Sequence, residues 1–428
     1  MKEMIENREE CDRVLLVAVR EGGEEECQES LAELAELVRT AGGACVGSVV
    51  QARESKHPGT YVGKGKIEEI RAMLEMEDIN CIVCDDELTP AQYNNLTEAL
   101  QVKIIDRTML ILDIFAGRAR TAEGKIQVEL AQLRYRSARL LGLGRSLSRQ
   151  GGGIGTRGPG EKKLEMDRRL IGKRISVLKE ELEEVTRHRD LIRGKRMSGI
   201  GPKTAAIVGY TNAGKSTLLN YLTGAGILAE DALFATLDPT TRAVELPDGN
   251  EILLTDTVGF IRKLPHHLIE AFRSTLEEAA CADLILHVVD ASNPRMDHQM
   301  EVVYETLVKL GAGDKPVYTL FNKIDLVGSE SENRLSDPRA RRVFEISAKT
   351  GEGVEGVLWG LSDFLLEGQR LLEAVIPYTD AGLISQIHSD GQMISEEYLP
   401  DGISVRAMVP TVLYGRIMKT AGFGSGTN

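Results

Sequence analysis

The stretch Gly209-Tyr210-Thr211-Asn212-Ala213-Gly214-Lys215-Ser216 decides the fold of this chain. Its spacing, G-x-x-x-x-G-K-S, follows an apolar, strand-like run at 204–208 and opens onto a helix-like run at 216–222. Glycines let backbone N–H groups curl around phosphate oxygens, Lys215 can reach the β- and γ-phosphates, and Ser216 can ligate Mg²⁺. The stretch therefore predicts a strand–loop–helix that binds a nucleoside triphosphate.

A second motif, Asn322-Lys323-Ile324-Asp325, predicts which base is bound. It follows the apolar run 317–321, so it should lie at the end of a strand. The carboxylate of Asp325 can accept hydrogen bonds from N1–H and the exocyclic amine of guanine, a donor pair that adenine lacks. Because an unpaired polar group in such a site costs discrimination of about 10⁴ or more, the motif favours GTP.

Three further segments complete the predicted site. Asp256-Thr257-Val258-Gly259 follows a strand-like run; Asp256 should lie in the second sphere of Mg²⁺ and the amide of Gly259 at the γ-phosphate. In Phe234-Ala235-Thr236-Leu237-Asp238, the hydroxyl of Thr236 can complete the Mg²⁺ coordination. Ser347-Ala348-Lys349 can close over the base. We therefore expect Lys215, Thr236 and Gly259 to be catalytic, and Ser216 and Thr236 to be the metal ligands.

Together these segments resemble the five nucleotide motifs of the HflX family of translation-associated GTPases. The runs 234–242 and 256–261 resemble this family more specifically than the generic motifs do, and the similarity extends upstream through the glycine-rich run 151–161. The similarity covers most of the chain and weakens after about residue 370. The resemblance implies GTP and GDP binding, GTP hydrolysis, and association with the large ribosomal subunit and its rRNA to split or rescue stalled ribosomes. The residues expected to bind nucleotide are Gly209, Tyr210, Thr211, Asn212, Ala213, Gly214, Lys215, Ser216, Thr217, Phe234, Ala235, Thr236, Leu237, Asp238, Asp256, Thr257, Val258, Gly259, Asn322, Lys323, Ile324, Asp325, Ser347, Ala348 and Lys349.

Composition places the chain in a reducing compartment. Its 428 residues contain six scattered cysteines, a first segment unlike a signal peptide, and no run of 18 apolar residues. We therefore expect a cytoplasmic protein without a transmembrane segment, and a monomer. Cys81 and Cys84 have the spacing of a redox or zinc pair, but they lack a second pair and lie in an apolar run, which favours buried strand cysteines.

Charge is distributed unevenly along the chain. The net charge is −13, yet residues 125–200 contain 19 Lys and Arg against 9 Asp and Glu. Two long helical patterns, 126–141 and 161–197, predict an antiparallel hairpin in this basic segment. The connection 142–160 is rich in glycine and carries Arg145, Arg149 and Arg157. It is either a tether or a loop that approaches RNA, and the charge favours the loop.

The fold class that we predict is α/β in four domains. Residues 1–121 alternate strand and helix signals and predict a parallel sheet. The basic hairpin spans 122–200. The GTPase domain spans 201–369, with a mixed but mostly parallel sheet because Asp248-Gly249 marks a hairpin. Residues 370–428 predict a small α/β domain with a second hairpin at Asp401-Gly402.

Three details of the sequence leave alternatives open. The run 61–66, which contains Lys64-Gly65-Lys66, precedes a helix. It has three possible interpretations: a plain basic loop, a contact with RNA phosphate, or a second nucleotide site. Asn212 either ligates K⁺ or stabilises the loop, so the expected cofactors are Mg²⁺ and, in the first case, K⁺. His266 and His267 are either a catalytic base or, more simply, exposed residues.

Hydrolysis should be slow without help, because Phe260 occupies the position where many GTPases carry a water-orienting glutamine. Three functions agree with the sequence: a ribosome-binding GTPase, a GTPase of ribosome assembly or RNA modification, and a non-catalytic nucleotide switch.

Overall fold

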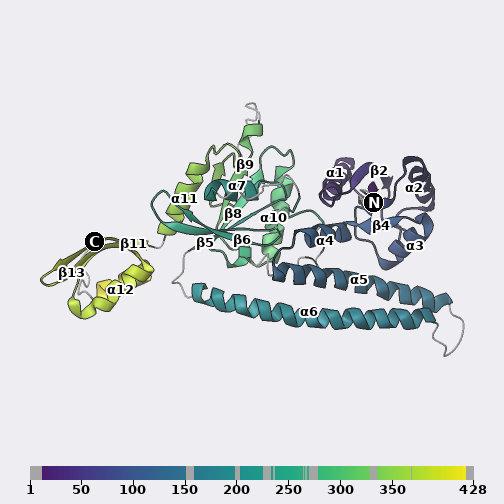
Figure 1. Ribbon diagram of the computed structural model, residues 1–428. Helices are drawn as coiled ribbons and strands as arrows, with labels where there is room; N and C mark the ends of the chain where they lie inside the picture. Colours follow the sequence, from purple (N-terminus) through teal and green to yellow (C-terminus); the bar gives the residue numbers. More distant parts are fainter. Residues whose placement is uncertain are drawn as a thin grey trace, which may run out of the picture.

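The computed structural model describes residues 12–150, 159–197, 203–224, 233–234, 237–263, 265, 268, 278–327, 335–367 and 369–420. Four parts follow one another along the chain (Figure 1). We call them the N-terminal domain (12–118), the hairpin (α5 and α6), the phosphate-loop domain (203–367) and the C-terminal domain (369–420). The predicted α/β fold class is confirmed by the sheets and helices below.

The N-terminal domain is a four-stranded parallel sheet in the order β2-β1-β3-β4. Its two central strands, β1 and β3, are short apolar runs buried on both faces, as in most parallel sheets, whereas the edge strand β2 is largely exposed or half-buried. Thr89 is the N-cap of α3 and forms a capping box with Gln92. The elements are β1 (Arg13–Arg20), α1 (Glu24–Thr40), β2 (Ala44–Ala52), α2 (Lys64–Glu77), β3 (Cys81–Cys84), α3 (Pro90–Leu100), β4 (Lys103–Asp106) and α4 (Arg107–Arg118).

Cys81 and Cys84 are both buried within β3, as predicted. Burial raises the pKa of Cys81 to about 12 and also raises the pKa of Cys84, so both thiols stay protonated and unreactive. Among the described residues, no group of His, Cys, Asp and Glu is arranged to hold a metal ion.

The hairpin is formed by α5 (Ala122–Gln150) and α6 (Pro159–Met197), which lie side by side below the N-terminal domain and part of the phosphate-loop domain (Figure 1). Our prediction that the connection starts at Gly142 is wrong, because α5 continues to Gln150. Helix-favouring Leu, Arg and Gln residues between 140 and 150 outweigh the cost of Gly142 and Gly144, roughly 1 kcal/mol each. Arg157 and the rest of the glycine-rich run to residue 158 lie outside the described residues.

The phosphate-loop domain contains a six-stranded sheet in the order β10-β9-β8-β5-β7-β6. Only β6 is antiparallel to its neighbour, which confirms the hairpin predicted at Asp248-Gly249. The strands and helices are β5 (Thr204–Gly209), α7 (Lys215–Thr223), β6 (Thr240–Glu245), β7 (Glu251–Asp256), β8 (Leu284–Asp290), α10 (Met296–Lys309), β9 (Val317–Asn322), β10 (Arg342–Glu345) and α11 (Val354–Leu366).

The C-terminal domain pairs three antiparallel strands, in the order β11-β13-β12, with two helices. Strands β12 and β13 form the hairpin predicted at Asp401-Gly402. The elements are β11 (Gln369–Ile376), α12 (Ala381–Asp390), β12 (Gln392–Leu399), β13 (Gly402–Pro410) and α13 (Thr411–Thr420). None of the helices described in the four parts has the length and hydropathy needed to span a bilayer.

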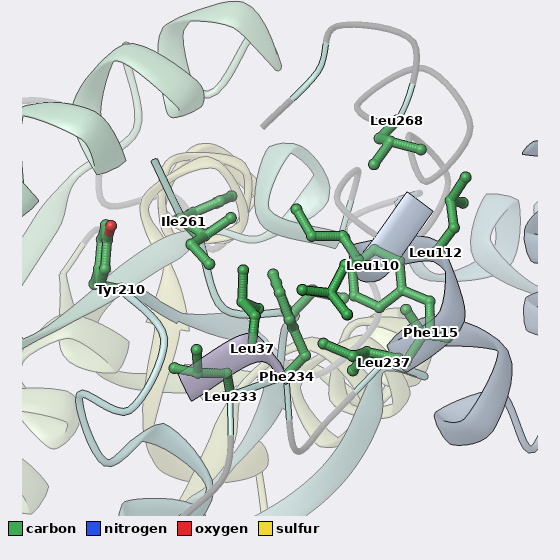
Figure 2. Close-up of a cluster of buried hydrophobic side chains, with 14 of the residues drawn as sticks. Leu37, Leu110, Leu112, Phe115, Tyr210, Leu233, Phe234, Leu237, Ile261 and Leu268 are labelled. Carbon is green, nitrogen blue, oxygen red and sulfur yellow. The ribbon is translucent and has the colours of Figure 1, made fainter. Parts of the chain in front are cut away.

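One hydrophobic core joins the N-terminal domain, α5 and the phosphate-loop domain. Leu37 of α1 and Phe115 of α4 belong to the same buried cluster as Phe234 and Ile261 of the phosphate-loop domain (Figure 2). The rings of Phe115 and Phe234 meet edge to face with centroids 4.7 Å apart. Phe234 and Ile261 lie two residues from Thr236 and Gly259 in sequence, so the segments predicted to contact Mg²⁺ and the γ-phosphate pack against another domain.

Candidate nucleotide-binding site

The phosphate loop is positioned by β5 and α7, as the sequence predicts. Gly214 precedes α7 with φ of 96°, and a Cβ added to it would lie 2.2 Å from Nδ2 of Asn322, so only glycine fits there. Asn212 has φ of 61°, a conformation that asparagine tolerates better than most residues. The resulting loop directs its backbone toward the carboxyl edge of the sheet, where open α/β sheets bind ligands.

Lys215 lies at the centre of the site and is only 7% exposed. Its Nζ donates to the carbonyl oxygens of Gly209 at 3.1 Å and Tyr210 at 2.8 Å. Burial lowers the pKa of Lys215 to about 8, and the nearby Asp256 opposes this shift. The ammonium group is thus held in place and poorly solvated, ready to pair with phosphate oxygens.

Ser216 and Asp256 are oxygen donors that fit Mg²⁺. Oγ of Ser216 donates to Oδ2 of Asp256 at 2.9 Å, and Asp256 is buried at the end of β7. A hydroxyl beside a buried carboxylate is the donor chemistry that a hard divalent cation takes when the remaining ligands are phosphate and water. Thr236, the other predicted ligand, lies outside the described residues, as does Ala235.

The predicted base-binding segments converge on the phosphate loop from β9 and the end of β10. The side-chain amide of Asn322 donates to the carbonyl of Ala213 at 2.8 Å, and its carbonyl oxygen accepts from the amide of Ala348 at 2.9 Å. Oγ of Ser347 donates to Oδ1 of Asp325 at 2.7 Å, which fixes the carboxylate predicted to recognise guanine. The three segments therefore form one connected hydrogen-bonded site.

Lys323 and Asp290 form an ion pair at this end of the site that the sequence did not predict. Nζ of Lys323 lies 2.7 Å from Oδ2 of Asp290, the last residue of β8. Lys323 itself adopts φ of 64°. Asp290 is also bonded to Ser292, so β8 and the turn after it hold the Lys323 side chain along the base-binding edge.

Gly259 and Phe260 lie directly against the phosphate loop. The amide of Phe260 donates to the carbonyl of Gly209 at 3.1 Å, and its carbonyl accepts from the amide of Thr211 at 2.8 Å. A Cβ on Gly259 would lie 3.0 Å from Nζ of Lys215 and 2.8 Å from Cγ2 of Thr211, so no larger residue fits. The side chain of Phe260 is buried in the interdomain core.

The segment 237–238 joins the start of the hairpin. The carboxylate of Asp238 accepts hydrogen bonds from the amides of Arg120 and Thr121, at 2.8 and 2.9 Å, and from the hydroxyl of Thr121 at 2.6 Å. That hydroxyl accepts in turn from the amide of Gly124 at 2.9 Å, which caps α5. Leu237 and Phe234 are buried in the interdomain core.

An ionic interface, also absent from our predictions, follows Gly259. The guanidinium of Arg262 pairs with Glu26 at 2.8 Å and with Glu29 at 2.7 Å, both on α1. Lys263 pairs with Asp85 and, at 3.2 Å, with Asp86. Burial alone would raise the pKa of Asp86, but Lys263 and hydrogen bonds from Tyr61 and Lys56 lower it overall, so the carboxylate stays ionised. The residues on both sides of this interface are far apart in sequence and carry no local motif.

Most of the predicted site residues that the structure describes lie together. The side chains of Tyr210 and Thr257 are exceptions, because they point away from the site. The side chain of Tyr210 faces the N-terminal domain, where its hydroxyl contacts Glu33. Thr257 is buried under the site, with its hydroxyl bonded to Ile207 at 2.7 Å. His266 and His267 lie outside the described residues. Lys64 and Lys66 begin α2, which has no side-chain N-cap, and Lys66 pairs with Glu69.

Three family models match consecutive parts of the chain. They are described as GTP-binding GTPase N-terminal, over residues 28–116; GTP-binding GTPase Middle Region, over 118–196; and 50S ribosome-binding GTPase, over 204–323. A solved GTP-binding protein of Sulfolobus solfataricus in complex with GDP covers 83% of this chain and 99% of its own, with 24% identity and a TM-score of 0.45.

Full-length relatives establish the family. A GTPase HflX of Lacrimispora saccharolytica is 61% identical over 98% of this chain and 99% of its own length. A GTPase HflX of Escherichia coli is 41% identical over 91% of this chain and 92% of its own length. The chain thus binds guanine nucleotides and hydrolyses GTP, and it belongs to the HflX family of GTPases.

Proposed function

We propose that this protein, in its GTP-bound state, binds the large ribosomal subunit and acts in splitting or rescuing stalled ribosomes. The observation that carries the proposal is the basic hairpin. In a chain of net charge −13, residues 125–200 hold 19 Lys and Arg against 9 Asp and Glu. A concentrated positive charge on an acidic protein is the electrostatic footprint of a polyanionic partner such as rRNA.

The shape of the hairpin supports the same partner. α5 and α6 have 29 and 39 residues, so at about 1.5 Å per residue they extend roughly 43 and 58 Å. Arg134 and Arg136 on α5, and Arg168 and Arg169 on α6, are exposed to solvent. Such a projection can reach into a deep, negatively charged cleft. The family model described as a 50S ribosome-binding GTPase supports the same partner. We expect a cytoplasmic monomer.

At the nucleotide, we assign the following roles to the main predicted residues. Lys215 neutralises the β- and γ-phosphates, the amide of Gly259 contacts the γ-phosphate, and Asp325 recognises guanine. Ser216, together with Thr236, would hold Mg²⁺, which supplies charge neutralisation on the phosphates when bound. Asn212 is exposed at the edge of the loop, where its side-chain oxygen could ligate K⁺.

Co-sedimentation with purified large ribosomal subunits tests the ribosomal partner. The protein should pellet with the subunits when loaded with a non-hydrolysable GTP analogue and remain in the supernatant with GDP. Binding should weaken steeply with salt, because neutralised phosphates release counterions. Simultaneous Arg145→Gln, Arg149→Gln and Arg157→Gln should weaken binding and flatten the salt dependence, with unchanged GDP affinity.

A control variant that loses the same number of positive charges distinguishes the effect of the hairpin from the effect of net charge. Arg339→Gln, Arg341→Gln and Arg342→Gln remove three positive charges from the phosphate-loop domain, outside the hairpin. If this control weakens ribosome binding as much as the hairpin variant does, the hairpin is not the docking surface. Light scattering of intact ribosomes distinguishes the alternative role in ribosome assembly or RNA modification, because only a splitting factor lowers the scattering when GTP is added.

A further inference from the structure

The hydrolytic site lacks a side chain that can assist the transferred phosphoryl group from the position after Gly259. Phe260 has no hydrogen-bonding side-chain atom, and its ring is 1% exposed within the interdomain core. Its backbone amide and carbonyl are both bonded to the phosphate loop. Assistance therefore has to come from a neighbouring group.

Thr211 of the phosphate loop borders the place where the γ-phosphate binds. A Cβ built on Gly259 would lie 2.8 Å from Cγ2 of Thr211 and 3.0 Å from Nζ of Lys215, so the three residues converge on one point. In phosphate-loop proteins the lysine reaches the β- and γ-phosphates. The side chain of Thr211 thus lies beside the reacting end of the nucleotide.

The hydroxyl of Thr211 is buried without a hydrogen-bond partner among the described residues. The residue is 7% exposed, and Oγ1 is bonded to none of their polar atoms. Its backbone amide already donates to Phe260 at 2.8 Å. A buried hydroxyl left unpaired costs roughly 1–3 kcal/mol, whereas a valine of the same shape would avoid that cost. Because burial of this hydroxyl without a partner is unfavourable, its place beside the site indicates that a bound nucleotide supplies the missing hydrogen-bond acceptor.

We propose that Thr211 is a catalytic residue whose hydroxyl donates a hydrogen bond to an oxygen of the γ-phosphoryl group. In this structure Cγ2 of Thr211 faces Gly259. A rotation of about 120° about Cα–Cβ brings Oγ1 to that position, and threonine readily adopts more than one staggered rotamer. The oxygen of water bonds to phosphorus while the bond to the β-phosphate oxygen breaks and its electron pair leaves with GDP. Both protons of the water end on the phosphate product, one on the oxygen that water contributes and one on another oxygen of the transferred group. Thr211 keeps its own proton while it orients the group.

Two substitutions at this position test the proposal in single-turnover GTP hydrolysis without ribosomes. Thr211→Val keeps the shape and removes the hydroxyl, so the rate constant should fall roughly 10- to 100-fold. Thr211→Ser keeps the hydroxyl and should restore most of the rate. GDP affinity should not change in either variant, because backbone amides hold the β-phosphate.

The melting temperature of the nucleotide-free protein distinguishes a catalytic role of Thr211 from a structural one. A structural role predicts that Thr211→Val melts at a lower temperature than the wild type. Because the hydroxyl is unpaired, Thr211→Val should unfold at the same temperature as the wild type or higher. The proposal is overturned if Thr211→Val hydrolyses GTP at the wild-type rate, if Thr211→Ser is as slow as Thr211→Val, or if Thr211→Val loses stability and GDP affinity together. None of these outcomes depends on whether the protein binds ribosomes.

Discussion

The hydroxyl of Tyr210 donates a hydrogen bond to Oε2 of Glu33, which joins the phosphate loop to α1 of the N-terminal domain. The same hydroxyl accepts from the amide of Arg262 at 3.0 Å. Glu33 also pairs with the buried Arg107. Burial raises the pKa of Tyr210, so the phenol keeps the proton that it donates. One side chain thus connects the phosphate loop, the segment after Gly259 and the N-terminal domain.

Tyr210→Phe removes this hydroxyl and keeps the ring. We expect the free energy of unfolding to fall by about 1–2 kcal/mol, because Glu33 and the amide of Arg262 each lose a partner. A double-mutant cycle with Glu33→Gln, measured by urea denaturation, should give a coupling energy of about 0.5–3 kcal/mol. Tyr398→Phe is the control, since Tyr398 is 70% exposed. Equal effects of the two phenylalanine substitutions would contradict the interdomain contact.

Asp325→Asn should change base selection. The asparagine amide no longer matches the two donors of guanine, so GTP affinity should fall by a factor of about 10² or more. The same amide can pair with the carbonyl of xanthine, so xanthosine nucleotides should bind better. Competition between fluorescent GDP and xanthosine diphosphate measures the preference. Ser347→Ala is a useful companion, because it removes only the hydroxyl that fixes Asp325. Full GTP affinity in Asp325→Asn would show that this carboxylate does not recognise the base.

Nucleotide binding should take up a proton at alkaline pH. Burial lowers the pKa of Lys215 to about 8 in the nucleotide-free protein, and bound phosphates favour its charged form. GDP affinity should therefore be constant below about pH 7 and fall by up to about tenfold per pH unit above pH 8. Calorimetry in buffers of different ionisation enthalpy measures the uptake directly.

Stability of the nucleotide-free protein gives a second test of the same pKa. The unfolded chain keeps the Lys215 proton up to its ordinary pKa of 10.5, whereas the folded protein loses it from about pH 8. The unfolded state then binds more protons, so the contribution of Lys215 to the free energy of unfolding rises with pH in this window. Lys215→Ala should lack both effects; if it keeps them, another group is responsible.

Phe260 should matter for folding more than for chemistry. Its ring is 1% exposed, so Phe260→Ala should lower the free energy of unfolding by about 3–5 kcal/mol. Phe260→Leu keeps most of the core and should hydrolyse GTP within about threefold of the wild-type rate, whereas Lys215→Ala should lose a factor of about 10² or more. A loss in Phe260→Leu as deep as that in Lys215→Ala would mean that the ring acts in hydrolysis.

Gly124 and Gly172 form a matched pair for the contact between Asp238 and α5. A Cβ on Gly124 would lie 2.3 Å from Oδ1 of Asp238, whereas a Cβ on Gly172 of α6 would meet nothing within 4 Å. Gly172→Ala should stabilise the protein by about 0.5–1 kcal/mol through helix propensity. Gly124→Ala should lower the melting temperature despite the same gain, because the carboxylate must move. Stabilisation by both substitutions would argue against the close approach.

Local patterns in the sequence predicted the fold and the nucleotide-binding edge well, for a physical reason. The phosphate loop, Asp256 and Asn322 each follow an apolar strand, and parallel strands bring their carboxyl ends to one edge. The hairpin turns at Asp248-Gly249 and Asp401-Gly402 likewise depend only on residues next to one another.

What the sequence could not predict depends on residues that are distant along the chain. Arg262 and Glu29 are 233 positions apart. The residues next to each of them in sequence do not distinguish a charge in an interface from an ordinary charge on the surface. α4 was not predicted because its apolar residues, such as Ile111 and Leu112, are buried on several faces and show no helical stripe. The direction of the Tyr210 side chain likewise depends on a domain that begins nearly 200 residues earlier.

The attachment of Asp238 to the first turn of α5 links the segment before β6 to a long rigid unit. α5 is packed on the N-terminal domain through Val128, Ala131 and Tyr135, which are buried in the interdomain core. From Ala122 to Gln150, at about 1.5 Å per residue, the helix measures roughly 42 Å. If the helix and that domain turned together by about 5° about Asp238, Gln150 would be displaced by about 4 Å, which is close to the diameter of a side chain.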